Sequence, residues 1–273
     1  MEILGYIASV FIGILLGLIG AGGSILTIPV MVYFFHIAAL PASSYSLFIV
    51  GFTSLFGAVQ KYQQGNMNRK IAIIFCLISL TVVSVVRMFI IPAIPYEMFV
   101  FQGIIITSSV LNMILFSGLM VIAGYSIIKS KYDYAPIVKP GYAIPRLLMC
   151  SIIVGLVTGL LGAGGGFIMI PALVVFLGLP MKEAIGTSLL IIALNSLIGF
   201  TMDLNHFEIN WKLLTGVTLV STFGIFIGLA LGKKISARQL KTAFGWFVLA
   251  VGILIFFKEM FALTIKLMIP MLS

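Results

Sequence analysis

The sequence has few charged residues: only 8% of its 273 residues are Asp, Glu, Lys or Arg. A soluble domain carries about 25%, so this chain could not cover a water-exposed surface with charged groups. Hydrophobic residues make up 62% of the chain, and the mean hydropathy is +1.26. These values exclude a cytosolic enzyme, a disordered protein and a disulfide scaffold. They predict a multi-pass protein of the cell membrane.

Cysteine and the motifs of hydrolytic or ATP-driven chemistry are also scarce. Cys76 and Cys150, the two cysteines, lie in apolar runs without the spacing of metal ligands. The sequence contains no phosphate-binding loop, no HExxH zinc motif and no GxSxG nucleophile elbow. We therefore expect no enzyme activity, no cofactor and no metal. The basic residues, which give a net charge of +9, lie in short loops, where they set membrane topology rather than bind nucleic acid.

Apolar runs long enough to cross a membrane dominate the chain, since a helix needs about 20 apolar residues to span the lipid. Polar loops at 61–70, 129–145, 203–210 and 233–238 separate the main runs. All seven acidic residues lie in loops or at the ends of runs. Arg87 is the one basic residue well inside a run, and we expect its side chain to extend to the membrane interface. The runs lie near 3–36, 43–60, 71–91, 98–128, 146–178, 184–202, 211–232 and 239–257.

An internal repeat divides the chain. GLIGAGGSILTIPVM at 17–31 matches GLLGAGGGFIMIPAL at 159–173, with 8 of 15 positions identical at an offset of 142. The same offset aligns Ser46 with Ser188 further along. The sequence therefore predicts two homologous halves with a polar linker between them: residues 1–135, 136–145 and 146–273.

Glycines interrupt the first run of each half, at Gly20–Gly23 and Gly162–Gly166. Glycine permits positive φ, and irregular backbone at membrane depth occurs only where protein or a wet cavity surrounds it. Each half is thus predicted to be a broken helix or re-entrant hairpin followed by three transmembrane helices, in an all-α polytopic fold. Hairpins would make the halves inverted repeats, whereas spanning elements would make them parallel repeats of four crossings each.

The distribution of Lys and Arg favours the inverted arrangement. Hairpins place 12 of these residues on one side of the membrane and 3 on the other, against 10 and 5 for spanning elements. Because basic loops stay in the cytoplasm, we expect the linker there and both termini outside.

The breaks are candidate anion sites. A break turns free amides and the positive end of a helix dipole into the membrane, and glycine amides can bind an anion. Pro29 and Pro171 follow the breaks, where each would bend its helix and free a carbonyl. The hypothesis needs no buried cation; close helix packing is the alternative role of the glycines. The candidate residues are Gly20, Gly22, Gly23, Ser24, Gly162, Gly164, Gly165 and Gly166 at the breaks, with Ser46, Thr53, Thr187, Ser188 and Asn195 on the following helices.

The doubled motif resembles the TauE/SafE family, also called the sulfite exporter or TSUP family. Its pattern G-L-x-G-x-G-G-[GS] followed by proline occupies Gly17–Pro29 and Gly159–Pro171, and the likeness continues at 45–47 and 186–189. The first copy departs from the family pattern at Ser24. The resemblance implies transport of small sulfur-containing or organic anions, such as sulfite, sulfonates or thiosulfate.

These observations together predict a secondary transporter, specifically an exporter, that holds a small anion between the paired breaks near the midplane of the bilayer. Access would alternate around this fixed site. A passive anion channel and a non-transporting membrane scaffold or assembly factor are the alternatives. The expected partners are the anion and the lipid bilayer, while the coupling ion (H+ or Na+) and the oligomeric state stay open.

Overall fold

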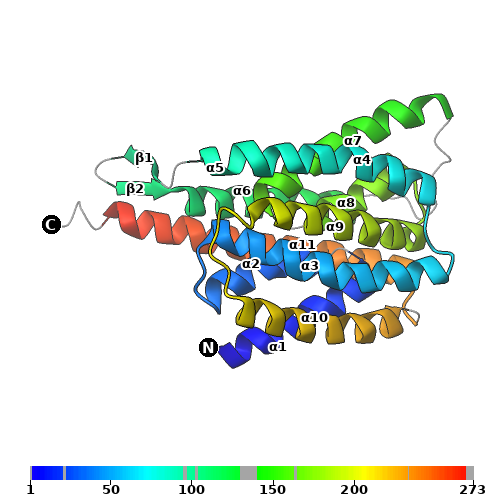
Figure 1. The fold of residues 1–273 in the computed structure, drawn as a ribbon, viewed down its shortest axis with the longest axis horizontal. Helices are drawn as coiled ribbons and strands as arrows, with labels where there is room; N and C mark the ends of the chain where they lie inside the picture. The colour runs from blue at the N-terminus through cyan, green and yellow to red at the C-terminus, as the bar shows by residue number, and fades with distance from the viewer. Residues whose placement is uncertain are drawn as a thin grey trace.

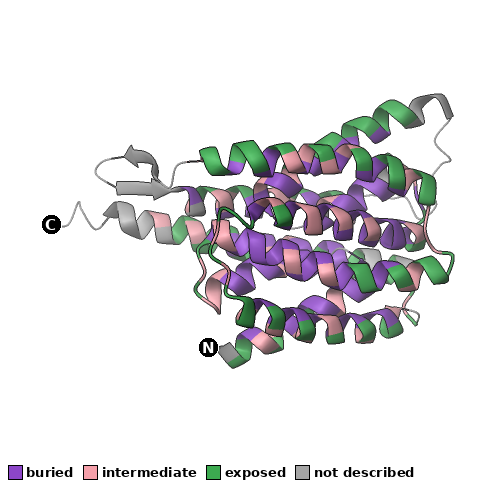
Figure 2. Cartoon of the chain, viewed as in Figure 1, coloured by how far each residue is buried: buried purple, intermediate pink, exposed green. Residues whose placement is uncertain are grey.

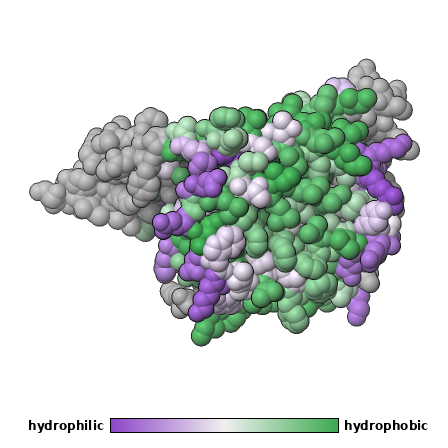
Figure 3. Space-filling view, viewed as in Figure 1, coloured by the Kyte–Doolittle hydropathy of each residue, from purple (hydrophilic) through white to green (hydrophobic). Residues whose placement is uncertain are grey.

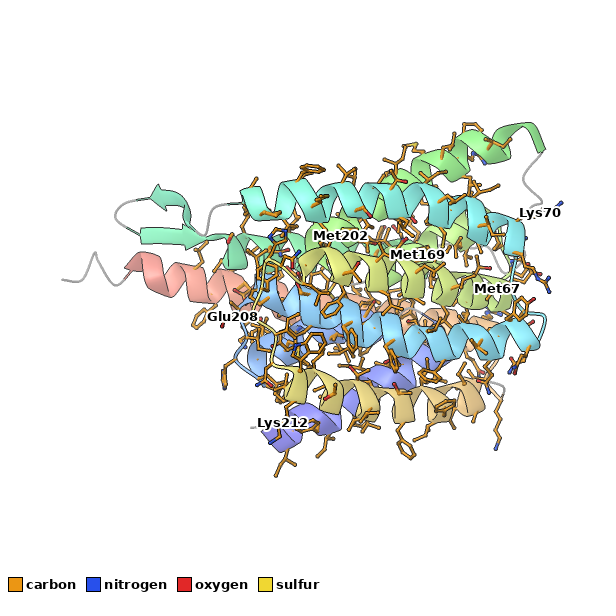
Figure 4. All side chains as sticks on the ribbon, viewed as in Figure 1. Met67, Lys70, Met169, Met202, Glu208 and Lys212 are labelled. Carbon is orange, nitrogen blue, oxygen red and sulfur yellow. The ribbon has the colours of Figure 1, made fainter. Side chains whose placement is uncertain are left out.

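The computed structural model describes residues 2–20, 23–94, 97–101, 104–129, 140–162, 165–232 and 234–268. Helices make up most of this part of the chain (Figure 1). Seven of them are long and apolar enough to cross a membrane, which confirms a polytopic membrane protein. Lys70 and Lys212 lie at opposite ends of the helix bundle (Figure 4). Apolar side chains cover the visible face between those ends, and hydrophilic residues gather at both ends (Figure 3).

The first half begins with two short helices and continues with three longer segments. Asn68 caps the fourth helix, because its side chain accepts a hydrogen bond from the Ile71 amide at 3.2 Å. The fourth helix passes into a π-helical turn that contains Arg87. The elements are α1 (Glu2–Ile19), α2 (Gly23–Tyr33), α3 (Ala39–Gln63), α4 (Arg69–Val85), the π-helical η1 (Val86–Ile90), α5 (Ile91–Ala93), β1 (Glu97–Phe101), β2 (Ile104–Thr107) and α6 (Ser108–Lys129).

The second half repeats this order without the strands. Asn210 caps its helix as Asn68 does, accepting from the Leu213 amide at 3.2 Å, and the two asparagines are 142 positions apart. The elements are α7 (Pro140–Leu161), α8 (Gly166–Pro171), the π-helical η2 (Ala172–Phe176), α9 (Met181–Asp203), α10 (Trp211–Gly232) and α11 (Ala237–Met268).

A pair of antiparallel strands, β1 and β2, departs from the expected all-α fold. The sequence predicted one helical run over 98–128, but the helix begins at Ser108. Residues 97–107 are rich in aromatic and β-branched side chains, which favour strands, and the 22 residues of α6 already suffice to cross the lipid.

Helices α3 and α9 form the centre of the bundle. Their most apolar windows are 72% and 67% buried, whereas those of the other five candidate spans are 28–44% buried. The two helices pack against each other, and Figure 2 shows the buried residues concentrated on them. The buried polar side chains of α3 and α9 are therefore shielded from lipid by protein.

Each half begins with two helical segments that fold back on each other. A Cβ on Gly23 of α2 would overlap the Ile12 carbonyl of α1, and one on Gly165 would overlap the Thr158 hydroxyl of α7. In Figure 1 the N-terminus and the end of α2 lie at the same end of the bundle. The breaks expected at Gly20–Gly23 and Gly162–Gly166 are thus present as reversals of the chain.

Each of these folded-back elements packs on a helix of the other half. Helix α1 contacts α10, and α7 contacts α4. Glycines allow the backbones of α1 and α10 to touch: a Cβ on Gly13 would overlap the Ser221 carbonyl, and one on Gly228 would overlap the Ile14 carbonyl. Small residues four apart are the usual means of such close packing in lipid. The two halves are therefore interleaved.

Candidate anion-binding site

The first glycine break contacts the start of α9. Helix α1 ends at Ile19, and Gly20 has φ +78°, a conformation that glycine adopts at no steric cost. A Cβ on Gly20 would lie 2.7 Å from the Ile185 side chain. The hydroxyl of Ser188, one turn further along α9, donates to the Ile185 carbonyl at 2.9 Å and approaches the Gly20 carbonyl at 3.4 Å. Gly22 lies outside the described residues.

The second break contacts the start of α3 in the corresponding way. Gly162 has φ +68° and Gly165 has φ +64°, and α8 begins directly afterwards at Gly166. A Cβ on Gly162 would overlap Ser43 of α3 and the Nη2 atom of Arg87. Gly164 lies outside the described residues. Each break thus lies against the central helix of the opposite half, and the second one also lies against a buried cation.

Arg87 is fully buried, which corrects the expectation that it extends to the membrane interface. Its Nη1 atom lies 2.6 Å from Oδ2 of Asp203, the last residue of α9, and both side chains are 0% exposed. Nη1 also donates to the Ser43 hydroxyl at 3.1 Å. Protein surrounds the guanidinium on all sides, so its charge is compensated by a carboxylate and not by water or lipid headgroups.

The ion pair leaves several polar atoms without a partner. Arg87 Nε and Nη2 and Asp203 Oδ1 make no hydrogen bond within the part of the chain that the structure describes. The Ser44 hydroxyl donates to the same Asp203 oxygen that Arg87 contacts. A buried donor without a partner costs roughly 1–3 kcal/mol, so these two donors on one guanidinium call for acceptors beyond those that the described residues supply.

The predicted polar residues on α3 (Ser46, Thr53) and α9 (Thr187, Ser188, Asn195) are all buried, but they differ in their hydrogen bonds. On α3, the hydroxyls of Ser46 and Thr53 have no hydrogen-bond partner among the described residues. On α9, the Thr187 hydroxyl accepts from the Asn68 amide at 3.0 Å. Asn195 exchanges hydrogen bonds with Ser79 of α4 at 2.8 and 3.1 Å. Thr187 and Asn195 therefore hold helices together.

The remaining predicted residues line the starts of α2 and α8. Gly23, Ser24, Gly165 and Gly166 are all buried. Pro29 lies inside α2. Pro171 ends α8, where the chain becomes the π-helical η2. Because proline lacks an amide, it interrupts the α-helical bonding there, and π-helical turns of this kind are frequent at functional sites.

A small cavity lies beside the second break. Its volume is 210 Å³. Two of its lining residues connect it to the surroundings of Arg87. Leu161 directly precedes Gly162, and the Leu40 carbonyl accepts a hydrogen bond from Ser43; Gly162 and Ser43 both lie against Arg87. The Ser108 hydroxyl is buried without a partner among the described residues. The cavity is lined by Leu40, Ile94, Ser108, Leu111, Asn112, Leu115, Leu160 and Leu161.

The two breaks lie toward opposite ends of α3 and α9: Gly162 meets Ser43 near the start of α3, whereas Gly20 meets Ile185 near the start of α9, and the two helices run antiparallel. Figure 4 places Met169 of α8 between Met67 and Lys70 at one end and Glu208 and Lys212 at the other. Ser43, Arg87 and Asp203 beside the second break are all buried. In the described ranges no group of three or more His, Cys, Asp or Glu residues could hold a metal.

Comparison with known proteins identifies the family. The model of the family Sulfite exporter TauE/SafE matches residues 5–255. The chain belongs to the TauE/SafE family. It is therefore a multi-pass membrane transporter of the kind that the sequence motif indicated. No solved structure matches the chain.

Curated relatives of this TauE/SafE protein carry corresponding names. A "Probable membrane transporter protein" of Xylella fastidiosa is 28% identical over 258 residues, covering 91% of this chain and 92% of its own. "Probable membrane transporter protein YdhB" of Bacillus subtilis is 26% identical over 249 residues, covering 90% and 96%. A "Probable membrane transporter protein" of Methanocaldococcus jannaschii is 24% identical over 253 residues, covering 86% and 88%.

The sequence missed the ion pair for two reasons. Arg87 and Asp203 are 116 residues apart, and Asp203 directly follows its apolar run, as the first residue of the predicted loop 203–210. One signal was available, because an ionisable residue inside a membrane segment usually faces the bundle interior and marks a functional site.

Proposed function

We propose that this TauE/SafE protein is a secondary transporter that exports small sulfur-containing or organic anions, such as sulfite or sulfonates. The observation that carries the proposal is the fully buried guanidinium of Arg87, which lies directly against Gly162 and whose Nε and Nη2 have no hydrogen-bond partner among the described residues. A guanidinium matches the planar oxygen pairs of sulfur oxyanions and carboxylates. It would attract an anion into a site that the rest of the bundle shields from lipid.

The proposed site combines Arg87 with the residues at the second break. The guanidinium would supply charge, the Ser46 hydroxyl one turn beyond Ser43 would donate a hydrogen bond, and amides at the start of α8 would bind further oxygens. Thr53, about 15 Å beyond Ser43 along α3, and the first break would line the path of the anion. Thr187, Ser188 and Asn195 would shape the path and fix the first break. The sequence-based hypothesis held the anion without a buried cation, whereas the site proposed here includes the buried guanidinium of Arg87.

An inverted repeat would let this site be reached from either side. The reversed elements α1–α2 and α7–α8, the contacts of α1 with α10 and of α7 with α4, and the matching caps at Asn68 and Asn210 support two halves related by a twofold axis through α3 and α9. We place both termini outside and the 129–145 linker in the cytoplasm of the cell. Rocking of one half against the other would then expose the site alternately.

The test is export of labelled sulfite and methanesulfonate from proteoliposomes. Arg87→Gln should abolish saturable flux, because it removes the buried positive charge that the break offers to the anion. Arg69→Gln is the matched control, since Arg69 lies over the Tyr62 ring at the end of α4 and also loses one positive charge. Equal flux in the two variants would contradict the proposal. Current that rises linearly with voltage, without saturation, would identify a channel instead.

A further inference from the structure

We infer that Asp203 is a proton-binding residue of this site, so that each anion binds together with one proton. The inference rests on the proposed anion site and extends it to the coupling ion. It starts from the fact that the negative charge beside Arg87 is the carboxylate of Asp203, which can lose its charge by binding a proton.

The hydrogen bonds of Asp203 leave one oxygen for a proton. Oδ2 accepts from Arg87 Nη1 and from the Ser44 hydroxyl. Oδ1 is buried and has no partner among the described residues. A proton on Oδ1 would neutralise the carboxylate while Oδ2 could still accept a hydrogen bond.

Charge balance explains why the anion and the proton would bind together. The pair of Arg87 and ionised Asp203 carries no net charge. An anion added to that pair would leave one uncompensated negative charge in a buried site, which is costly. If a proton moves from the aqueous phase to Oδ1, the anion replaces the carboxylate as the counter-charge of Arg87, and the occupied site is again neutral. The transported unit is then one anion and one proton, and no bond other than that to the proton changes.

The position of Asp203 gives the proton a short path. Asp203 ends α9, and Leu204, Asn205 and His206 directly after it are exposed. Its own carbonyl accepts from the His206 amide at 2.9 Å. The carboxylate is thus buried in the bundle yet lies within one turn of the loop that meets water.

Few other titratable groups face Asp203. Arg87 and His206 are the charged neighbours that act on its carboxylate. Tyr45, next to Ser44 on α3, uses its hydroxyl to accept from the Asn210 amide at 2.6 Å. The other titratable side chains that the structure describes on the elements packed against α9 are Lys61, Tyr62, Arg69, Lys70, Cys76, Arg146, Cys150, Arg238, Lys258 and Glu259.

The test measures proton uptake on anion binding by the purified full chain in weakly buffered detergent. Methanesulfonate and 2-hydroxyethanesulfonate are the probes, because a sulfonate keeps its charge and any proton must come to the protein. A pH indicator should report about one proton taken up per anion bound. Anion affinity should fall about tenfold per pH unit where Asp203 is ionised in the free protein, since the two ligands are reciprocally linked.

Two variants assign the proton to its residue. Asp203→Asn should still bind the sulfonate, with affinity independent of pH and without proton uptake. His206→Gln should retain both the uptake and the pH dependence, whereas their loss would move the proton to His206 and overturn the inference. In proteoliposomes the wild-type flux should follow the anion and pH gradients and ignore a membrane potential set with valinomycin and potassium.

The outcomes separate the two proposals. Binding of a sulfonate by the wild type without proton uptake, at affinity independent of pH, would overturn the inference and leave the anion site intact. Absence of any binding and of any sulfite or sulfonate flux would overturn the proposed function and the inference with it. The wild-type measurement decides these outcomes even if Asp203→Asn does not fold.

Discussion

Removing either member of the buried ion pair should destabilise the protein strongly, whereas removing both should not. Arg87 and Asp203 are 0% exposed and 2.6 Å apart. Arg87→Met or Asp203→Leu leaves a buried charge without its partner, which costs about 3–5 kcal/mol. The double variant buries two apolar side chains in the same space, and such replacements are often neutral or stabilising. We therefore expect a large favourable coupling between the two substitutions.

Thermal unfolding in detergent would measure this cycle. Cys76 and Cys150 are free and buried, so a thiol-reactive dye reports their exposure as the bundle opens. At about 2–4 °C per kcal/mol for a chain of this size, each single variant should lower the Tm by roughly 6–20 °C. The double variant should recover most of that loss. A double variant whose loss equals the sum of the two singles would show that the residues do not interact, and the description of the site would be wrong.

Further substitutions test the breaks and the packing between helices. Gly165→Ala places a Cβ at φ +64° against the Thr158 hydroxyl and should cost about 1–3 kcal/mol in the same thermal assay, whereas Gly118→Ala in α6, where a Cβ would meet nothing within 4 Å, should be neutral or gain up to about 1 kcal/mol. Asn195→Ala removes both buried hydrogen bonds to Ser79, whose hydroxyl keeps the Cys76 carbonyl at 3.4 Å, and should cost about 1 kcal/mol. A Tm unchanged within error would show that these bonds contribute nothing. Gly13→Leu should separate α1 from α10 and lower the yield of folded protein in size-exclusion chromatography, and a normal elution profile would argue against backbone contact there.

The glycine breaks could be predicted because their signal is local. Overlong apolar runs interrupted by glycine clusters need only the geometry of a helix and the thickness of a bilayer to be interpreted. The structure places chain reversals at both clusters, with positive φ at Gly20, Gly162 and Gly165. The repeat offset further indicated that the two reversals would have similar surroundings.

The chemistry around the breaks depends on contacts that the sequence does not encode locally. Arg87 meets Asp203 only because η1 packs against α9, and nothing near either residue in the sequence announces the other. For the same reason the stripe of Ser46, Thr53, Thr187 and Asn195 resembled one uniform lining. The last two in fact bond to Asn68 and Ser79, which come from segments more than a hundred residues away.

The interleaving of the halves has a consequence for biogenesis. The Ser221 hydroxyl of α10 donates to the Ser9 carbonyl of α1 across 212 residues of chain. At about 5–20 residues per second, a ribosome needs roughly 10–40 s to synthesise that interval. Until α10 is made, the glycine face of α1 has no native helix to pack against. We therefore expect the new segment to stay bound to the insertion machinery or to a membrane chaperone during this interval. A nascent chain halted before α10 should accordingly crosslink to such a holder through the Gly13–Gly17 face.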